Sequence, residues 1–476
     1  MRRLARWMVE YWHREFNKGK FQTTYLGDPK MDKVQCVVVG AGPAGSACAL
    51  SLARKGIETV LLERGAHAGD KNVASFVLFT PVLRKLIPDF EGGAPLERLV
   101  DDQSSIYLGE KDFQQIRLRF QNHADKRLAY TAYRSKFDAW FAEKAREAGA
   151  ELLTNVLVTD LLMENGRVTG VKVGEEELQA DVVVGADGIH TVVGRQAGLV
   201  SDDIRTYLLG VKEVLDLDSE LIEERFQLEK GKGTVYETFG YPMDDIDGAS
   251  TLYTNNDSLT IAVFGGVDAI KERGVDLHDR LQQLKEHPFI HSLVKDSKLR
   301  EYQAHIISNG GRMDLSDLYS DGVLLCGEAG GFSDYMYIGV PPGMLSGMMA
   351  ANTVEYAVKK GDYSAGTMQE YIAFMENTAL PRMLYKSRQA SNYLVKEGRR
   401  GLPDHVRNVA EIIDKSFEDE VTYLNPEPYP MVLEFYLRIV EKWVPDFLRK
   451  PIRTIIKALS PLGSALSRRK IRKVMR

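Results

Sequence analysis

Cysteine and tryptophan are scarce in this chain of 476 residues, which contains three and four copies of them. Cys36, Cys48 and Cys326 lack the spacing of zinc or iron–sulfur ligands, so the sequence excludes such a site built from cysteines alone. We expect three buried thiols in a reducing compartment. The charge-free stretch 337–354 contains Pro341-Pro342 and three glycines, which argue against a membrane-spanning helix.

We also expect no targeting signal in the first 20 residues. No apolar core of a secretory signal is visible, and Glu10, Glu15 and the absence of serine argue against a mitochondrial presequence. The composition is 44% hydrophobic and 27% charged, as in ordinary globular proteins. The length predicts two or three domains.

The two ends of the chain are basic, although the net charge is −5. Residues 1–20 hold six Lys or Arg and two Glu, and residues 447–476 hold ten Lys or Arg and no acid. Residues 1–21 also repeat apolar and aromatic side chains at helical spacing, as do residues 432–444. We therefore expect both ends to bind an anionic membrane surface. The alternatives are helices docked on the protein itself with solvated tails, or a true start at Met31.

A glycine motif between a predicted strand and a predicted helix says most about the chain: Gly40-Ala41-Gly42-Pro43-Ala44-Gly45. Gly40 permits a sharp turn, Gly42 leaves room for a pyrophosphate, and Gly45 lets the helix pack closely on the sheet. The helix N-terminus offers free N–H groups and the positive end of the dipole. Glu63, 23 residues beyond Gly40, suits an adenosine ribose. The motif predicts a dinucleotide site, and the alternative is a tight turn without a ligand.

Hydrophobic periodicity predicts the other elements in outline. We expect a loop entering a short helix over 71–79, strands over 104–130, a helix over 133–149, strands over 151–184, a buried strand over 181–188, a β-rich region over 207–267 with a hairpin turn at 253–258, a buried strand over 322–328, a helix over 343–359, and helices from 365 onward.

Three signatures in order resemble the FAD-binding fold of the glutathione-reductase-2 type: Gly40–Gly45 with Glu63, Ala186-Asp187-Gly188, and Gly327-Glu328-Ala329-Gly330-Gly331. Further motifs are similar to the FixC-type electron-transfer-flavoprotein:quinone oxidoreductases: Glu63-Arg64-Gly65, Gly69–Val73, Leu86–Phe90, Ala94–Arg98, Leu252–Asn255, Asp257-Ser258, Gly343-Met344 and Ser346-Gly347. The resemblance covers roughly residues 33–365.

The fold that this resemblance implies is α/β, with a discontinuous Rossmann-like FAD-binding domain, a β-rich substrate domain and a helical C-terminal region. The expected boundaries are 1–32 for a basic amphipathic extension, 33–105 with 130–205 and 306–365 for the FAD-binding domain, 106–129 with 206–305 for the substrate domain, and 366–476 for the helical region with its polybasic tail.

The resemblance also implies the residues that bind FAD. At the ADP half they would be the Gly40 loop with Pro43 and Ala44, and Glu63 beside Arg64, with Arg134 as an anchor and Asp187 at the pyrophosphate loop. Gly327 and Glu328 would lie at the ribityl chain, and the helix start at Gly343 and Met344 at the pyrimidine edge. Lys71 and Asn72 would lie along the isoalloxazine ring. For Arg134 and Lys71 the alternative is a surface cation. We assign no catalytic side chain and no metal ligand; Tyr335 and Tyr337 are candidates for bonding a substrate carbonyl.

Two departures from the family pattern concern the flavin. Glu328 stands where relatives usually have aspartate, and Ala74-Ser75-Phe76 stands where they tend to have paired glycines. The first change requires adjusted geometry at the ribityl chain. The second puts a phenylalanine where the backbone passes close to the ring, which affects the identity of the substrate more than FAD binding.

The implied function is electron relay from an electron-transfer flavoprotein to membrane quinone. The chain lacks a ferredoxin-like domain and a second Rossmann loop, so electrons would come from a protein donor, directly or through a separate small ferredoxin-like protein. We expect a cytoplasmic enzyme, peripheral on the inner face of the membrane, with no nucleic-acid partner. The alternatives are a reductase of isoprenoid double bonds similar to geranylgeranyl reductases, a hydroxylase or halogenase, and a binding protein that has lost turnover.

Overall fold

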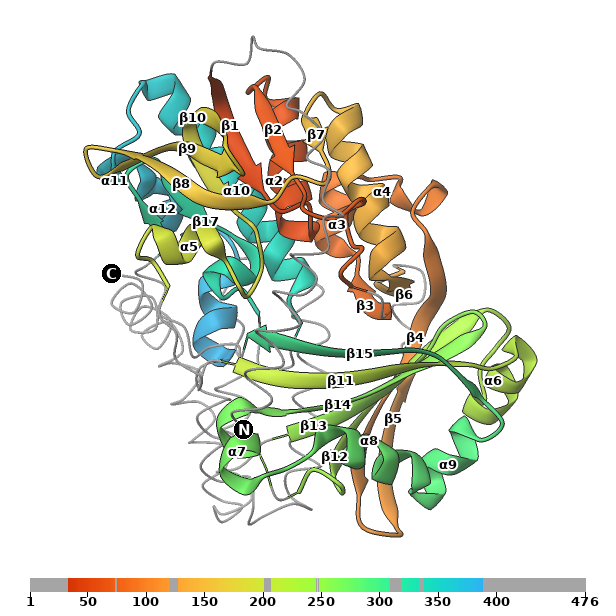
Figure 1. Cartoon of the computed structure of the whole chain (residues 1–476). Helices are drawn as coiled ribbons and strands as arrows, with labels where there is room; N and C mark the ends of the chain where they lie inside the picture. The colour runs from red at the N-terminus through yellow and green to blue at the C-terminus, as the bar shows by residue number, and fades with distance from the viewer. Residues whose placement is uncertain are drawn as a thin grey trace, which may run out of the picture.

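The computed structural model describes residues 33–72, 75–119, 127–200, 207–244, 246, 248–308, 318–333 and 338–387. The expected N-terminal extension, Ala74, Tyr335, Tyr337 and the C-terminal stripe with its polybasic end lie outside the described residues. The described chain forms two β-sheets, one above the other in Figure 1, with helices packed on each.

The first sheet is mostly parallel and runs in the order β16 (Tyr319–Ser320), β17 (Val323–Leu325), β10 (Glu176–Gly185), β1 (Val34–Val39), β2 (Thr59–Leu62) and β7 (Glu151–Leu153). Strands β8 (Val158–Glu164) and β9 (Arg167–Val173) extend β10 as an antiparallel hairpin. The apolar runs of β1, β2 and β10 are buried on both faces, as expected for parallel strands.

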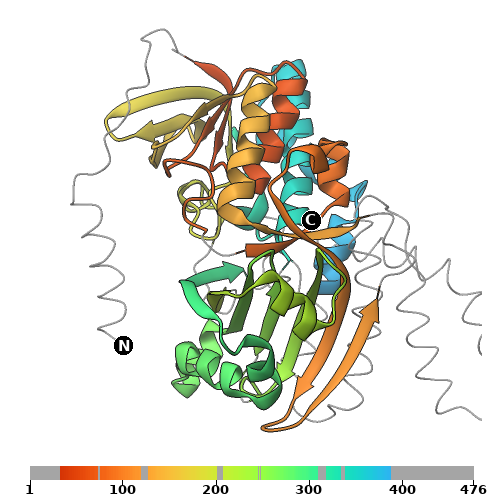
Figure 2. The ribbon, with the colours of Figure 1, turned by 90° about the vertical axis from the view of Figure 1, so that its right-hand side faces the viewer.

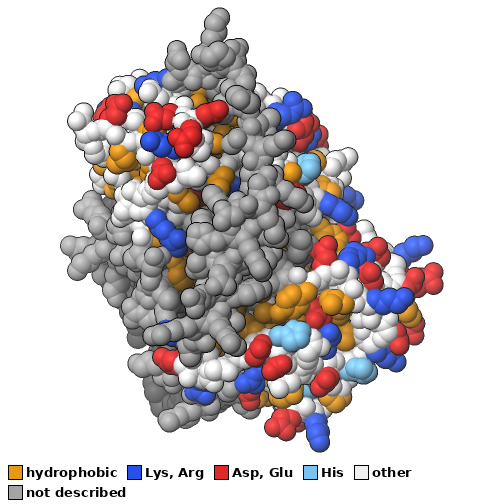
Figure 3. Space-filling view, viewed as in Figure 1, with side chains coloured by type: hydrophobic (Ala, Val, Ile, Leu, Met, Phe, Trp, Pro, Cys, Tyr) orange, Lys and Arg blue, Asp and Glu red, His pale blue; other side chains and the backbone are white. Residues whose placement is uncertain are grey.

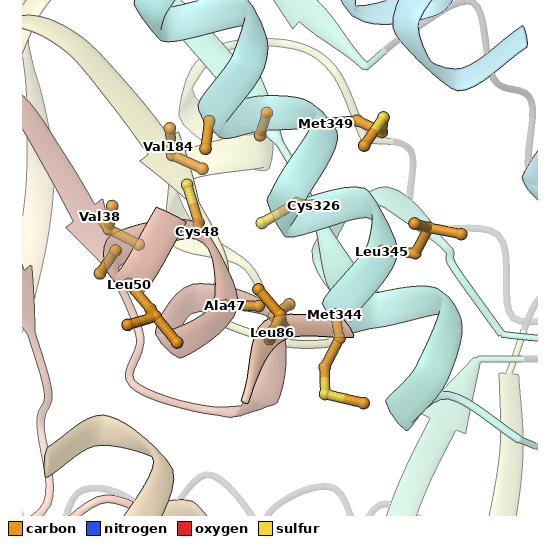
Figure 4. Close-up of a cluster of buried hydrophobic side chains, with 14 of the residues drawn as sticks. Val38, Ala47, Cys48, Leu50, Leu86, Val184, Cys326, Met344, Leu345 and Met349 are labelled. Atoms are coloured by element: carbon orange, nitrogen blue, oxygen red, sulfur yellow. The ribbon is translucent and has the colours of Figure 1, made fainter. Parts of the chain in front are cut away.

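Helices α2 (Pro43–Arg54), α4 (Arg134–Glu147) and α10 (Val340–Lys360) pack together beside this sheet (Figure 1). Their shared core contains Cys48 of α2 and Cys326 after β17, whose side chains face each other beside α10 in Figure 4. All three cysteines are buried, and burial raises the pKa of each thiol. The expectation of buried thiols is therefore confirmed.

Within the described residues, the second sheet contains nine strands and is mostly antiparallel. Its order is β15 (Lys298–Ser308), β11 (Tyr207–Asp216), β14 (Ser258–Gly266), β13 (Gly248–Thr254), β12 (Lys232–Gly240), β4 (Leu96–Leu108), β6 (Ala129–Tyr133) and β3 (Ser75–Phe79), with β5 (Phe113–Arg119) paired to β4. Figure 2 shows this sheet from the side, beneath the helices of the first.

This sheet curls until strands that are distant in its order meet. The Tyr253 hydroxyl on β13 donates to the Ser75 carbonyl on β3, and Ser75 Oγ lies 2.6 Å from Thr260 Oγ1 on β14. We call the face that carries Tyr253 and Thr260 the inner face. The outer face contributes Leu252 and Ile261 to an apolar core under α6 (Ser219–Phe226), α8 (Leu277–Glu286) and α9 (Pro288–Val294).

Short elements complete the described chain: α3 (Pro81–Leu86), η1 (Phe90–Gly92), α5 (Val192–Gln196), α7 (Val267–Arg273), η5 (Gly327–Gly330), α11 (Ala365–Met368) and α12 (Glu370–Glu376). None of the described helices is long and apolar enough to cross a membrane.

The predicted α/β fold class is confirmed, and most expected elements occur. The helix expected over 71–79 is wrong, because Ser75–Phe79 forms β3 and the short helix α3 begins at Pro81. Helices α6 to α9 within the β-rich region were not expected. The domain boundaries stay a prediction, although β3, β6 and most of β4 fall in segments assigned to the FAD-binding domain and pair in the second sheet.

Candidate functional site

At two positions of the glycine turn after β1, no residue other than glycine fits. Gly40 has φ +101°, and a Cβ there would lie 2.5 Å from the Ala186 carbonyl oxygen. A Cβ on Gly45 would lie 1.9 Å from the Gly40 carbonyl oxygen, so helix α2 could not approach the turn. At Gly42 a Cβ would meet nothing within 4 Å, which leaves open space at the N-terminus of α2. This geometry suits an anionic group above the helix.

Glu63 lies beside this turn and is already oriented by the backbone. Its Oε2 accepts the Ala41 N–H at 3.1 Å, and its Oε1 accepts the Gly65 N–H at 2.7 Å. Each carboxylate oxygen retains a lone pair, so ribose hydroxyls can donate to Glu63 without displacing these bonds. The neighbouring Arg64 is exposed.

Asp187, from the second signature, follows the end of β10 and faces the start of α5. Its Oδ2 accepts the N–H groups of Val192 at 2.7 Å and Val193 at 3.1 Å. Its Oδ1 is buried without a hydrogen-bond partner within the described part of the chain. Burial raises the pKa of this carboxyl. A buried oxygen without a partner is a group that a ligand hydroxyl or a water completes.

The third signature meets the first at Ala44, where a Cβ on Gly327 would lie 2.7 Å and a Cβ on Gly343 3.6 Å from the alanine methyl. Glu328 Oε1 accepts the Ser308 N–H of β15 at 3.2 Å, and burial raises the pKa of Glu328. The Met344 side chain is fully buried in the core (Figure 4), so only its backbone can serve a ligand.

Arg134 begins α4 and is held by an acid on its own helix. Its Nε lies 2.9 Å from Asp138 Oδ1 and its Nη2 2.8 Å from Asp138 Oδ2. The guanidinium lies 5.6 Å from the centre of the Phe76 ring, and that ring packs against Phe137 at 5.5 Å. Arg134 is therefore a positioned, partly buried cation and not a loose surface charge.

Two further basic side chains reach the same region from the second sheet, Lys212 on β11 and His305 on β15. Burial, and next the charge of Arg134, lowers the pKa of Lys212 to about 8. Burial, followed by the charges of Arg134 and Lys212, lowers the pKa of His305 to about 4. We call Arg134 and Lys212, with His305 neutral beside them near pH 7, the cationic cluster. Its unfavourable self-repulsion would be relieved by an anion such as a diphosphate.

Sequence reasoning missed Lys212 and His305 because no motif surrounds them. The signal in the sequence was a lysine within the apolar strand Tyr207–Asp216, where a charge is costly without a partner.

Lys71 and Asn72 lie where the two sheets meet. The Lys71 carbonyl accepts from Gln303 Nε2 on β15 at 3.1 Å, while its side chain is exposed. The Asn72 N–H donates to the Gly69 carbonyl at 2.8 Å. The structure thus brings the three signatures, Arg134 and the Lys71 segment to one region between the sheets. The open helix end, the unpartnered Asp187 oxygen and the cationic cluster fit a dinucleotide.

Comparisons with known proteins agree with this geometry. The family described as FAD dependent oxidoreductase matches residues 35–198, and the family described as ETF-QO, ubiquinone-binding matches residues 207–307. The probable electron transfer flavoprotein-quinone oxidoreductase YdiS of Escherichia coli K12 is 34% identical over 395 residues, covering 81% of this chain and 91% of YdiS.

The chain belongs to the FixC and YdiS family of FAD-dependent oxidoreductases. It is an enzyme of that class, and its cofactor is FAD. FixC of the same organism is 34% identical over 74% of this chain and 83% of its own length. FixC of Azorhizobium caulinodans is 33% identical over 73% and 81%.

Solved structures show the same fold. A geranylgeranyl bacteriochlorophyll reductase-like protein from Thermoplasma acidophilum superimposes with a TM-score of 0.66 at 20% identity, covering 80% of this chain and 91% of that one. The flavin-dependent brominase Bmp2 gives a TM-score of 0.57 at 16% identity, covering 81% of this chain and 100% of its own. At these identities the likeness concerns the fold alone.

Proposed function

We propose that this enzyme accepts electrons from an electron-transfer flavoprotein and passes them to a membrane quinone. The observation that carries the proposal is the match of residues 207–307 to the ubiquinone-binding family. In the structure this segment forms five strands of the second sheet, from β11 to β15, next to the predicted FAD site. The relative YdiS, with which the chain aligns over most of its length, carries the matching name.

The described residues suggest how FAD is held in this scheme. The Gly40 turn and the N-terminus of α2 would bind the diphosphate, Glu63 the ribose, and Glu328 the ribityl chain. Bound FAD supplies reversible two-electron redox chemistry. The cationic cluster would balance the negative charge of the diphosphate.

Helix α10 begins at Val340, not at the expected Gly343. Pro341 and Pro342 carry no N–H, and the Gly343 N–H already donates to the Gly339 carbonyl. At the pyrimidine edge the positive end of the helix dipole would therefore favour the reduced form.

The proposal also includes the place in the cell where the enzyme acts. The basic, apolar ends of the chain would hold the enzyme on the inner face of the cytoplasmic membrane, where each Lys or Arg near an anionic leaflet contributes about 1 kcal/mol. Quinone tails lie in the bilayer, so this position would bring the flavin to its acceptor. The donor would bind directly or through a separate ferredoxin-like protein.

The test is an anaerobic assay with the full chain loaded with FAD, a reduced electron-transfer flavoprotein and a short-tailed ubiquinone. We expect quinol to form only when all three are present, and more rapidly when the quinone is in vesicles of anionic lipid than in neutral vesicles. A full chain whose flavin the donor reduces, but which leaves the quinone oxidised, would refute the proposal. Replacing the donor by dithionite, added until the flavin is reduced and no excess remains, separates a failure of the donor step from a failure of the quinone step.

A further inference from the structure

The inner face of the second sheet carries a row of polar and charged side chains. A line of residues in register crosses six strands: Ser105, Glu237, Thr251, Ala262, Lys212 and Gln303. Its last member donates to the Lys71 carbonyl, in the segment expected to lie along the flavin. The line therefore connects the predicted FAD site with the middle of β4.

Two side chains on β4, at the end of this line, have buried oxygen atoms without a partner. Gln103 and Ser105 are 6% and 4% exposed. Neither Gln103 Oε1 nor Ser105 Oγ has a hydrogen-bond partner within the described part of the chain. A buried polar group left in this state costs about 1–3 kcal/mol. Two of them at alternate positions of one strand are groups that a ligand or a water would complete.

The neighbours of Gln103 are apolar, whereas Ser105 has one apolar and one acidic neighbour. Gln103 pairs in register with Val235 on β12 and Leu118 on β5, and both of those side chains pack in the cluster that contains Tyr253. Ser105 pairs with Ile116 on β5 and with Glu237 on β12. A few polar groups set in an apolar surface are typical of sites that bind small amphiphilic molecules.

We propose that Gln103 and Ser105 bind the two ring oxygens of the quinone on the inner face of the second sheet. Residues i and i+2 of a strand lie on one face about 6.6 Å apart, a span comparable to that of the carbonyl oxygens on opposite sides of a six-membered ring. A serine hydroxyl can donate to a carbonyl and accept from a hydroxyl, and a glutamine amide does both by turning over. The pair can thus serve quinone and quinol alike.

This inference rests on the proposed function, because it names the residues that would hold the proposed acceptor. It also adds strand β4 to the acceptor site, although β4 lies outside the segment that matches the ubiquinone-binding family.

The test uses the full-length holoenzyme and its double variant Gln103→Leu with Ser105→Ala. We expect the KM for a short-tailed ubiquinone to rise about tenfold or more, since two hydrogen bonds are lost. Turnover with ferricyanide, which needs no ring site, should stay at the wild-type value. The melting temperature without quinone should be equal or higher, because two unsatisfied groups have been removed.

The matched control is Thr238→Val on the neighbouring strand β12. Thr238 is also buried and its Oγ1 also lacks a partner among the described residues, but it pairs with Ile106 on the outer face. We expect this variant to keep the wild-type KM. The rise in melting temperature that ubiquinone causes should persist in the control and disappear in the double variant.

The outcomes separate the two proposals. A double variant with wild-type KM and a wild-type thermal shift overturns the assignment of Gln103 and Ser105. The same holds if Thr238→Val weakens quinone binding as much as the double variant does. A wild-type enzyme that transfers electrons to ferricyanide but neither binds nor reduces ubiquinone overturns the proposed function itself.

Discussion

The two sheets place their polar groups in opposite ways. In the first sheet the strands β1, β2 and β10 are apolar and buried, and the polar chemistry lies in turns at their carboxyl ends, at Gly40, Glu63 and Asp187. In the second sheet, buried polar and charged side chains sit within the strands. The first arrangement can be read from short motifs. The second depends on pairing between distant segments.

Arg98 on β4 shows what distant pairing means. It is 1% exposed and lies in the second sheet. Its guanidinium donates to the Asn255 carbonyl at 2.6 Å, to Glu223 Oε1 at 2.9 Å and to Ser219 Oγ at 2.6 Å. These partners lie more than 100 positions away in the sequence. A buried charge here holds together segments that no local pattern connects.

The largest effect is expected from a substitution that disrupts the glycine turn of the first sheet. In Gly45→Ala the new methyl would lie 1.9 Å from the Gly40 carbonyl oxygen, so the turn and α2 must separate. We expect the loss of at least about 4 kcal/mol of unfolding free energy, or no folded protein. Urea denaturation of the apoprotein measures it, with Gly42→Ala as the control, because a methyl there meets nothing within 4 Å. Equal stability of the two variants would contradict the description of the turn.

The next largest effect is expected from a substitution that removes a buried charge from the second sheet. Arg98→Met removes the charged partner of Glu223 and the donor to the Lys232 and Asn256 carbonyls, and we expect a loss of about 3–5 kcal/mol in urea denaturation. The control is Arg84→Met, which removes a pair with Glu91 that is more exposed. A loss at Arg98 no larger than at Arg84 would show that the buried network contributes little.

A smaller effect concerns the pH dependence of stability. We expect it to come from the cationic cluster, which lies where the two sheets meet. The pKa of Lys212 is about 8 in the folded chain and 10.5 ordinarily, so the unfolded chain binds more protons between these values. The apoprotein should therefore gain stability, by about 1–3 kcal/mol, as the pH rises from 8 to 10.5. Lys212→Met should flatten this rise, while Lys172→Met, at an exposed lysine, should keep it. Parallel stability curves for the wild type and Lys212→Met would contradict the assignment.

The smallest effect on stability comes with a clear effect on binding. Gly42→Ala should change the unfolding free energy of the apoprotein by no more than about 0.5 kcal/mol, since the position is open. It should weaken FAD binding, because the methyl occupies the space left for the diphosphate. Titration of apoprotein with FAD, followed by flavin fluorescence, measures this. Unchanged affinity would place the diphosphate elsewhere.

The same contrast explains how much could be predicted from the sequence. The unit from Val34 to Glu63 was predicted because turn, helix and acid stand within 30 residues and each has a local physical reason. The strand Ser75–Phe79 was predicted as the approach to a helix, because its partners, Thr260 and Tyr253, come almost 200 residues later. Lys212, His305, Gln103 and Ser105 were missed for the same reason. Which of these side chains lie close together depends on the register between strands, and no single segment of the sequence determines that register.

The most direct test of the account is a single anaerobic measurement on the full chain loaded with FAD. The flavin is reduced with dithionite until no excess remains, a short-tailed ubiquinone is added, and the flavin absorbance is followed. The account predicts that the oxidised flavin spectrum returns as quinone is reduced, one quinone for each FAD. Flavin that stays reduced with ubiquinone, yet is oxidised at once by ferricyanide, would contradict it.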